Sequence, residues 1–386
     1  MSKGETAGER LDQPAMDRRL MLRAGLAVPL LALGGAAAAQ SPSNAGKARP
    51  PRLPYRRIAT EEAWIAPEVV AEYRKALAAG GNTELEPQWG GLKDSQTNPM
   101  LDRLLDIGEG RIADMDAAGT DLQILSLTAP GVQVFDADLA VALATASNDR
   151  LAEAVRTHPT RFAGLAAVAP QAPAAAAREL ERGVRKLGLK GAIINSHTHG
   201  EYLDDPKYWP IFEAAEALDV PIYIHPQLPS PGMVKPYLDR GFEKAIMGYG
   251  HEVSLHTLAI IASGALDRFP KLKLVIGHGG EGLPYMLYRI DYMWKYTPGA
   301  RPGRISLLPS DYMRRNVFIT TSGMPSAPAL KLAREVLGMD RILYAMDYPY
   351  CYDLDEVRLT DELPFTPAEM AALYEGNAVR VFGLDA

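Results

Sequence analysis

The chain has 386 residues, of which 47% are apolar and 23% are charged, and its formal net charge is −6. This composition is typical of a soluble globular enzyme, and the length allows one large barrel domain or two ordinary domains. The absence of a basic block argues against nucleic acid as a partner. A single cysteine, Cys351, excludes an internal disulfide and a thiolate metal cluster within one chain.

The first forty residues have the pattern of an export signal. Arg18 and Arg19 precede an apolar run rich in Ala and Gly, at 24–39, which ends in small residues. This order is typical of a twin-arginine signal peptide, so we expect residues 1–39 to be removed and the mature protein to be periplasmic. An uncleaved anchor is the alternative, but a span requires about 20 strongly apolar residues, and no later segment supplies them. Residues 40–54, with Pro, Gly and Ser, are predicted to be a flexible linker.

From residue 55 onward, short β-type runs alternate with helical patterns. Strands are predicted at 57–60, 122–127, 162–168, 192–195, 220–225, 272–277, 317–321 and 342–345. Helices are predicted at 66–79, 101–118, 139–157, 174–187, 208–218, 251–264, 283–294, 330–337 and 367–382. Eight strands that alternate with helices indicate one parallel (β/α)8 TIM barrel over residues 55–386. A doubly wound sheet is the alternative, although no Gly-rich phosphate loop follows the first strand.

The loop after the fifth predicted strand is rich in Pro and Gly and extends to Gly250. Structureless loops of this length are uncommon in compact domains and are often functional. We therefore expect a lid or an interface insertion here.

Four strand ends carry side chains suited to chemistry: Glu61, His225, His278 and Asp347. In a barrel, these ends converge on one mouth. Two carboxylates and an imidazole suit Mn²⁺ or Zn²⁺ with positions left open for water or substrate, so Glu61, His225 and Asp347 are the predicted metal ligands. His278 is the predicted acid–base residue. Any one of these residues alone could be structural, for example an aspartate that caps a turn.

Several motifs resemble the amidohydrolase superfamily. They are RIATEEA at 57–63, YIHP at 223–226 and HGGEGLPY at 278–285. More narrowly, the chain resembles the branch of metal-dependent aromatic acid decarboxylases. YAMDYPY at 344–350 and INSHT at 194–198 are most similar to the 5-carboxyvanillate decarboxylases and more distantly to the γ-resorcylate decarboxylases. The resemblance extends over residues 55–385.

The resemblance implies one divalent metal held by Glu61, His225 and Asp347. Ala63 stands where many relatives carry a histidine ligand, and Asn195 stands where hydrolytic relatives carry a metal-bridging lysine. Both departures favour a single cation, and Mn²⁺ over Zn²⁺.

The implied reaction is non-oxidative decarboxylation of an ortho-hydroxy aromatic acid. Asp347 would bind the metal and donate a proton to the ring carbon that bears the carboxylate. His278, paired with Glu281, would hold the phenolic oxygen or relay protons. A metal-dependent hydrolase or hydratase acting on a lactone or ring-cleavage product is the alternative enzyme, and a non-catalytic exported binding protein is a third possibility.

Further residues are predicted to contact the substrate. The resemblance assigns Arg111 and Arg289 to it. Trp64 and Tyr350 flank ligand positions and could sandwich an aromatic ring, and His197 follows the fourth predicted strand and could reach the mouth of the barrel. Arg289 corresponds to an arginine that reaches a neighbouring subunit's site, which implies a homodimer or a dimer of dimers. The alternatives are a solvated helix arginine for Arg111, a surface ion pair for Arg289, and core packing for Trp64 and Tyr350.

Overall fold

The protein is described by a computed structural model over residues 44–93, 98–297 and 305–385. The chain divides into two units, Met1–Gly35 and Ala36–Ala386, and all described residues belong to the second. The predicted signal peptide lies outside the described residues. Within the described ranges, no helix combines the length and the apolar character that a membrane crossing needs.

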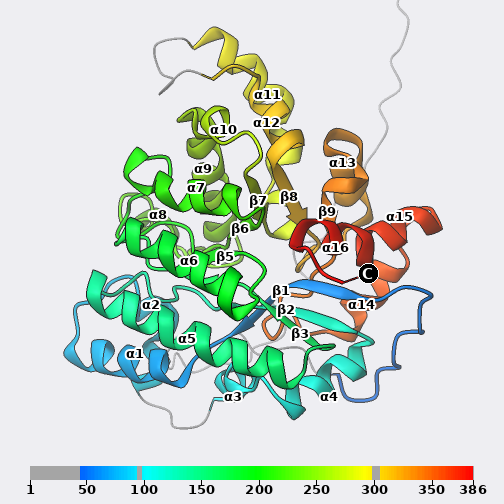
Figure 1. Cartoon of the computed structure of the whole chain (residues 1–386). Coiled ribbons are helices and arrows are strands. Elements are labelled where there is room, and N and C mark those ends of the chain that lie inside the picture. Colours follow the sequence, from blue (N-terminus) through cyan, green and yellow to red (C-terminus); the bar gives the residue numbers. More distant parts are fainter. Residues whose placement is uncertain (1–43, 94–97, 298–304, 386) are drawn as a thin grey trace, which may run out of the picture. The chain divides into compact units, whose positions relative to one another are not determined.

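Parallel strands form the centre of the fold (Figure 1). They are β1 (Ile58–Trp64), β2 (Leu122–Leu127), β3 (Phe162–Gly164), β4 (Ala166–Ala167), β5 (Ala192–Ile194), β6 (Pro221–Ile224), β7 (Lys273–Ile276), β8 (Val317–Thr320) and β9 (Ile342–Leu343). β1, β2 and β3 pair in that order, and β4 to β9 form a second sheet in chain order. β3 and β4 together occupy the third predicted strand, which is interrupted only at Leu165.

Backbone hydrogen bonds join the two sheets into one barrel. The amide of Leu165 donates to the carbonyl of Leu125 at 2.8 Å, which continues the ladder across the break between β3 and β4. On the other side, Thr60 N–H donates to Tyr344 O at 3.0 Å and Ala63 N–H donates to Tyr348 O at 2.7 Å. The last strand therefore returns to the first, and the predicted (β/α)8 barrel is confirmed.

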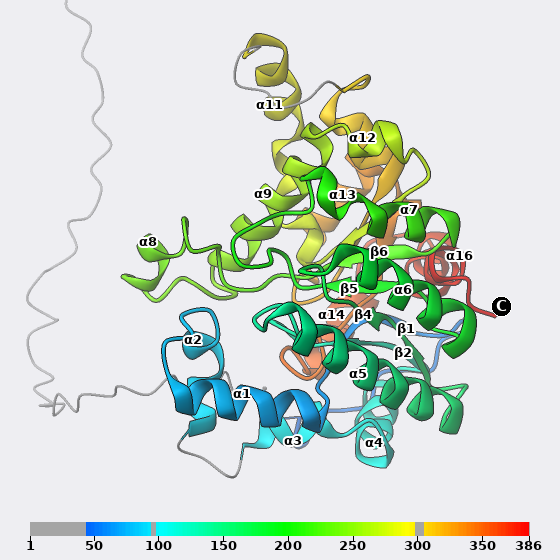
Figure 2. The same ribbon diagram turned by 60° about the vertical axis from the view of Figure 1, so that its left-hand side comes forward.

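Helices surround these strands (Figures 1 and 2). Their bounds are α1 (Pro67–Ala79), α2 (Glu86–Trp89), α3 (Pro99–Leu105), α4 (Glu109–Ala118), α5 (Ala137–Thr157), α6 (Pro173–Leu187), α7 (Trp209–Ala217), α8 (Lys235–Leu238), α9 (Gly248–Ala262), α10 (Ala265–Arg268), α11 (Leu283–Tyr296), α12 (Pro309–Asn316), α13 (Ala327–Leu337), α14 (Leu354–Asp361), α15 (Pro367–Ala371) and α16 (Asn377–Phe382). One large cluster of buried apolar side chains, drawn from both the strands and the helices, fills the space between them.

The helix predicted at 101–118 is wrong as a single element. Asp106 leaves the helical conformation at the end of α3, and its side chain accepts a 2.8 Å hydrogen bond from Gly108 N–H. Gly108, which precedes α4, also has a non-helical backbone. A short aspartate side chain that bonds the backbone two residues later competes with the helix, which explains the break.

Part of the predicted flexible linker is held in place. The side chain of Asn44 donates to Tyr352 O and accepts from Leu354 N–H. Lys47 forms ion pairs with Asp353 and Asp355. The described part of the linker is therefore attached to the beginning of α14.

The insertion after β6 is confirmed. It extends from Pro226 to the beginning of α9 and contains the short helix α8. Figure 2 shows α8 projecting from the barrel on the same side as α2. Lys244 and Ala245 of the insertion line a cavity together with Trp89 of α2, so the insertion forms part of the cover over the barrel mouth.

Candidate active site

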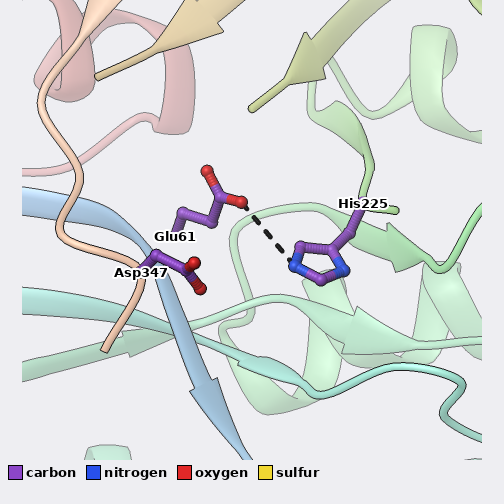
Figure 3. A group of neighbouring side chains, drawn as sticks. All are labelled: Glu61, His225 and Asp347. Carbon is purple, nitrogen blue, oxygen red and sulfur yellow. Dashed lines mark ion pairs between the residues drawn. The ribbon is translucent and has the colours of Figure 1, made fainter. Parts of the chain in front are cut away.

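Three predicted ligands meet at one end of the barrel. Glu61 comes from β1, His225 directly follows β6, and Asp347 lies in the loop after β9. Each offers one ligand atom, and these atoms all lie within 4.8 Å of one another. Figure 3 shows the three side chains, with a dashed line between Glu61 and His225. Glu61 Oε1 lies 3.6 Å from Nε2 of His225. The arrangement can hold one metal ion.

The sequence predicted that Glu61 follows the first strand. In the structure, Glu61 lies inside β1. The pairing of β1 with β2 shifts its register between Ala59 and Glu62. Such a bulge inserts an extra residue and re-aims the side chains beside it. The irregularity is therefore placed where β1 presents Glu61 to the mouth of the barrel.

The two carboxylate oxygens of Glu61 have different partners. Oε2 accepts a 2.7 Å hydrogen bond from Thr320 Oγ1 and further hydrogen bonds from the hydroxyls of Tyr223 and Ser322. Oε1 is buried and has no hydrogen-bond partner among the described residues, and the same holds for Nδ1 of His225. A buried acceptor without a partner is costly, and a bound cation would satisfy Oε1. The donor set therefore fits a divalent metal.

Charge and burial set the protonation of these ligands. Burial alone would raise the pKa of Glu61, but the imidazoles of His278 and His225 lower that pKa below its ordinary value. Burial lowers the pKa of His225, against the opposing effect of the Glu61 and Asp347 carboxylates. A carboxylate and a neutral imidazole are the forms that coordinate metals, so Glu61 and His225 are prepared for coordination.

His278 is held beside the ligands by Glu281. Its Nδ1 donates a 2.6 Å hydrogen bond to Glu281 Oε1, while Nε2 lies 3.5 Å from Glu61 Oε1 and 3.8 Å from Asp347 Oδ2. Burial alone would lower the pKa of His278, but the charges of Glu281 and Glu61 and the nearby Asp347 carboxylate raise it well above its ordinary value. His278 can therefore carry a proton next to Asp347.

Gly277 precedes His278, and the site requires a glycine there. A Cβ at this position would lie 2.8 Å from Glu61 Oε1, closer than real Cβ contacts. Any side chain would therefore displace the carboxylate from the cluster.

Asp347 has a backbone conformation that is unusual for a residue other than glycine. Its φ is +59°, in the left-handed region, which costs about 1–2 kcal/mol for an L-residue. Cys351 N–H donates to Asp347 O at 2.9 Å, and the thiol of Cys351 lies 3.4 Å from Oδ2. Burial raises the pKa of Asp347, while His278 opposes this shift. Burial also raises the pKa of Cys351, so this residue remains a thiol.

A cavity of about 250 Å³ opens beside the cluster. At one end it contacts His225, His278, Asp347 and Cys351. Its walls are largely apolar. They include Trp89, Leu92, Met100, Leu101, Leu104, Ala129, Pro226 and Ala245, with polar atoms from Gln88, Asn98, Thr128, Lys244, Tyr249 and Tyr350. An aromatic acid can place its ring against such a wall and its anionic group at the cluster.

Of the predicted substrate residues, only Tyr350 is brought to this cavity. Its hydroxyl forms a 2.7 Å hydrogen bond with Thr128 Oγ1. Trp64 is buried in the apolar core and does not line the cavity. His197 is also buried, where Nδ1 accepts from Gly200 N–H and Nε2 donates to Leu228 O, and burial lowers its pKa to about 4. His197 therefore joins two loops.

Arg111 is also placed away from the cavity. Its side chain is 0% exposed and donates to the carbonyls of Asp106, Ala63 and Arg103 and to Gln123 Oε1. The hydrogen-bond donors of the guanidinium are thus directed at other groups of the protein, and Arg111 holds the surrounding backbone together. Arg289 lies exposed on α11, which begins five residues after His278.

Sequence reasoning missed several cavity residues. Trp89, whose indole N–H donates to Ala129 O at 3.0 Å, lies on α2, a single-turn helix that was not predicted. Lys244 is the one lysine or arginine among the described residues that line the cavity, and it lies in the insertion. A single-turn helix carries no periodic pattern, so the sequence offered no signal for Trp89. The length of the insertion marked the segment that contains Lys244, but not this residue.

Comparisons with known proteins agree with this geometry. The family model described as amidohydrolase matches residues 61–384. The γ-resorcylate decarboxylase of Polaromonas sp. is 37% identical over 309 residues, which cover 77% of this chain and 93% of that protein.

Solved structures give the same result. One similar structure is 5-carboxyvanillate decarboxylase from Novosphingobium aromaticivorans, complexed with manganese and 4-hydroxy-3-methoxy-5-nitrobenzoic acid. It is 43% identical with a TM-score of 0.83, over 86% of this chain and 97% of that one. A dihydroxybenzoic acid decarboxylase from Polaromonas sp., with bound manganese and 2-nitroresorcinol, is 34% identical with a TM-score of 0.75, over 86% and 98% of the two chains.

Proposed function

Since this chain belongs to the amidohydrolase family, we propose that it is a metal-dependent decarboxylase that releases CO2 from an ortho-hydroxy aromatic acid of the vanillate or resorcylate kind. One observation carries the proposal. Glu61, His225 and Asp347 form a buried one-metal cluster that opens onto an apolar cavity of aromatic-ring size. The aromatic acid decarboxylases to which the chain is similar support the same reaction class.

One divalent cation per chain, with Mn²⁺ favoured over Zn²⁺, fits the donor set. Two carboxylates and one imidazole are mostly hard oxygen donors, which suit Mn²⁺. Ala63 cannot add a nitrogen ligand, and the side chain of Asn195 donates to Leu127 O at 3.3 Å instead of joining the cluster. The manganese in two similar structures supports this choice. A cation bound here would supply a point of attachment for the substrate's neighbouring phenolic and carboxylate oxygens.

The protein's own groups would move the proton. Asp347, as the carboxylic acid, protonates the ring carbon that bears the substrate carboxylate. The bond from that carbon to the carboxylate then breaks, CO2 leaves, and the electron pair restores the aromatic ring. Asp347 is left as a carboxylate, and His278, whose Nε2 lies 3.8 Å from Asp347 Oδ2, is placed to return a proton to it. Glu281 fixes the His278 ring for this transfer.

A second copy of the chain would complete the site. Aromatic and apolar side chains remain exposed along α11; they are Tyr285, Met286, Tyr288, Tyr292, Met293 and Tyr296. Tyr288 is 83% exposed, and Arg289 lies among these residues. Large exposed aromatic stripes are typical of interfaces between subunits. We propose a homodimer or a dimer of dimers in which Arg289 reaches the partner's site and pairs with the acidic substrate.

Hydrolysis of a lactone or ring-cleavage product is the weaker alternative, because the two similar structures with bound manganese are decarboxylases. A panel of benzoic acids, assayed for CO2 with added Mn²⁺, separates the two functions. Acids with a hydroxyl ortho to the carboxylate should release CO2, their ortho-methoxy analogues should not, and chelation should stop the reaction until Mn²⁺ is restored. Turnover of lactones without CO2 release would reject the proposal.

A further inference from the structure

Glu62 follows the metal ligand Glu61 on β1, but its side chain serves a different part of the site. The carboxylate is 0% exposed. Its Oε1 accepts a 2.9 Å hydrogen bond from Met346 N–H, and its Oε2 accepts a 3.1 Å hydrogen bond from Tyr348 N–H. Met346 and Tyr348 are the two neighbours of Asp347 in the chain. One carboxylate therefore holds the backbone on both sides of Asp347.

We propose that Glu62 is a positioning residue for Asp347. Asp347 has a φ of +59°, which an aspartate keeps only where the surroundings impose it. With one peptide anchored before it and another after it, its Cα–Cβ bond has little freedom to turn away from the cluster. Glu62 thereby keeps the Asp347 carboxylate in the metal cluster, beside His278 and the cavity, although Glu62 itself lines none of the cavity.

A buried series of hydrogen bonds, from Arg111 through Gln123, holds Glu62 in place. Gln123 Nε2 donates to Glu62 Oε2 at 3.4 Å, and Gln123 Oε1 accepts from Nη1 of Arg111 at 3.2 Å, which fixes the orientation of the amide. The Arg111 guanidinium lies 4.5 Å from the centre of the Tyr348 ring. Met346, Tyr348 and Gln123 all present N–H donors to Glu62, so a carboxylate matches this environment and an amide does not.

The inference rests on the proposed function as far as proton transfer by Asp347 is concerned. The effect of Glu62 on Asp347 as a metal ligand can be measured separately, through Mn²⁺ affinity. Glu62→Gln keeps the shape of the side chain and places an NH2 group against a backbone N–H donor, so one of the two anchors is lost. Glu179→Gln is the matched control. Glu179 is also a buried carboxylate, but it bonds Asn148 and Arg182 and lies outside the cavity.

The test measures kcat and KM at saturating Mn²⁺, the Mn²⁺ dissociation constant and the melting temperature for both variants. Loss of an outer residue that orients a ligand typically costs about 10- to 100-fold in metal affinity or activity, and we expect this loss in kcat and Mn²⁺ affinity for Glu62→Gln, with KM nearly unchanged. Glu179→Gln should lower the melting temperature alone. Wild-type kcat and Mn²⁺ affinity in Glu62→Gln, or equal losses in Glu179→Gln, would overturn the proposal.

Two further outcomes remain decisive. If the wild-type protein decarboxylates no acid of the panel, the proposed function fails, and the Mn²⁺ affinity of Glu62→Gln alone decides on the positioning role. If Glu62→Gln does not fold, Glu62→Asp replaces it. This shorter carboxylate cannot reach both amides in their present places, so weakened Mn²⁺ binding supports the proposal and wild-type binding overturns it.

Discussion

Nδ1 of His278 and Oε1 of Glu281 lie 2.6 Å apart, and this hydrogen bond directs the other imidazole nitrogen toward Glu61 and Asp347. Both residues have positive φ angles within a glycine-rich turn, so the pair is built by the local backbone. Because the Glu281 charge helps to raise the pKa of His278, the pair can act as a proton reserve for Asp347.

Glu281→Gln tests this pair through the pH dependence of turnover. Removing the carboxylate removes an interaction that raises the pKa of His278, so the pKa should fall. If protonated His278 is needed, activity is present below its pKa and is lost as pH rises through it. The alkaline limb of the kcat profile should therefore move to lower pH in Glu281→Gln. Glu335→Gln, at an exposed glutamate, is the control and should leave the alkaline limb in place. An unmoved limb in Glu281→Gln would contradict the role of Glu281 in raising the pKa of His278.

Metal binding should release protons. The pKa values of His278 and Asp347 are both raised in the metal-free protein, and a bound cation would lower both. Between the metal-free and metal-bound pKa values, affinity should therefore rise with pH. Calorimetric titration of Mn²⁺ in two buffers of different ionisation enthalpy measures this release and also counts the sites. Proton uptake, or two cations per chain, would disagree with the one-metal cluster.

The fold could be predicted from the sequence to a large extent, because strands that alternate with helices indicate a parallel barrel. In such a barrel, the C-terminal ends of all strands lie at the same mouth. The ligand cluster followed from the same rule: Glu61, His225 and Asp347 meet as expected. What the sequence could not predict was the direction of individual side chains. Trp64 follows the motif that contains Glu61, and Arg111 was expected to contact the substrate, yet both side chains are buried in the packed interior. Only three-dimensional packing decides in which direction such a side chain points.

A shared active site predicts recovery of activity from two inactive variants. Asp347→Asn and Arg289→Ala proteins are purified separately and then allowed to exchange subunits. If Arg289 serves the partner's site, one site in each mixed dimer contains an intact Asp347 and an intact Arg289, so about one quarter of all sites regain activity at equal mixing. If Arg289 serves its own chain, tagged mixed dimers stay as inactive as their parents. If it forms only a surface ion pair, Arg289→Ala is active by itself, and the shared site is rejected without mixing.

Export can be tested apart from catalysis. Arg18 and Arg19 lie outside the described residues, and their predicted role rests on the sequence alone. Replacing both by lysine should leave precursor inside the cell, because the twin-arginine route requires the pair. Lysine substitution at Arg49 and Arg52, beyond the signal, is the control. Equal periplasmic yield from both double variants would exclude this route.

Decarboxylation in D2O tests the central claim most directly. Wild-type protein with Mn²⁺ and an ortho-hydroxy aromatic acid should release one CO2 per product and place one deuterium on the ring carbon that lost the carboxylate. Asp347→Asn, which cannot deliver a proton as an acid, should lower this rate by about 10²- to 10⁴-fold. Near-normal turnover in Asp347→Asn, or substrate consumption with no CO2 and no ring deuterium, would contradict the account.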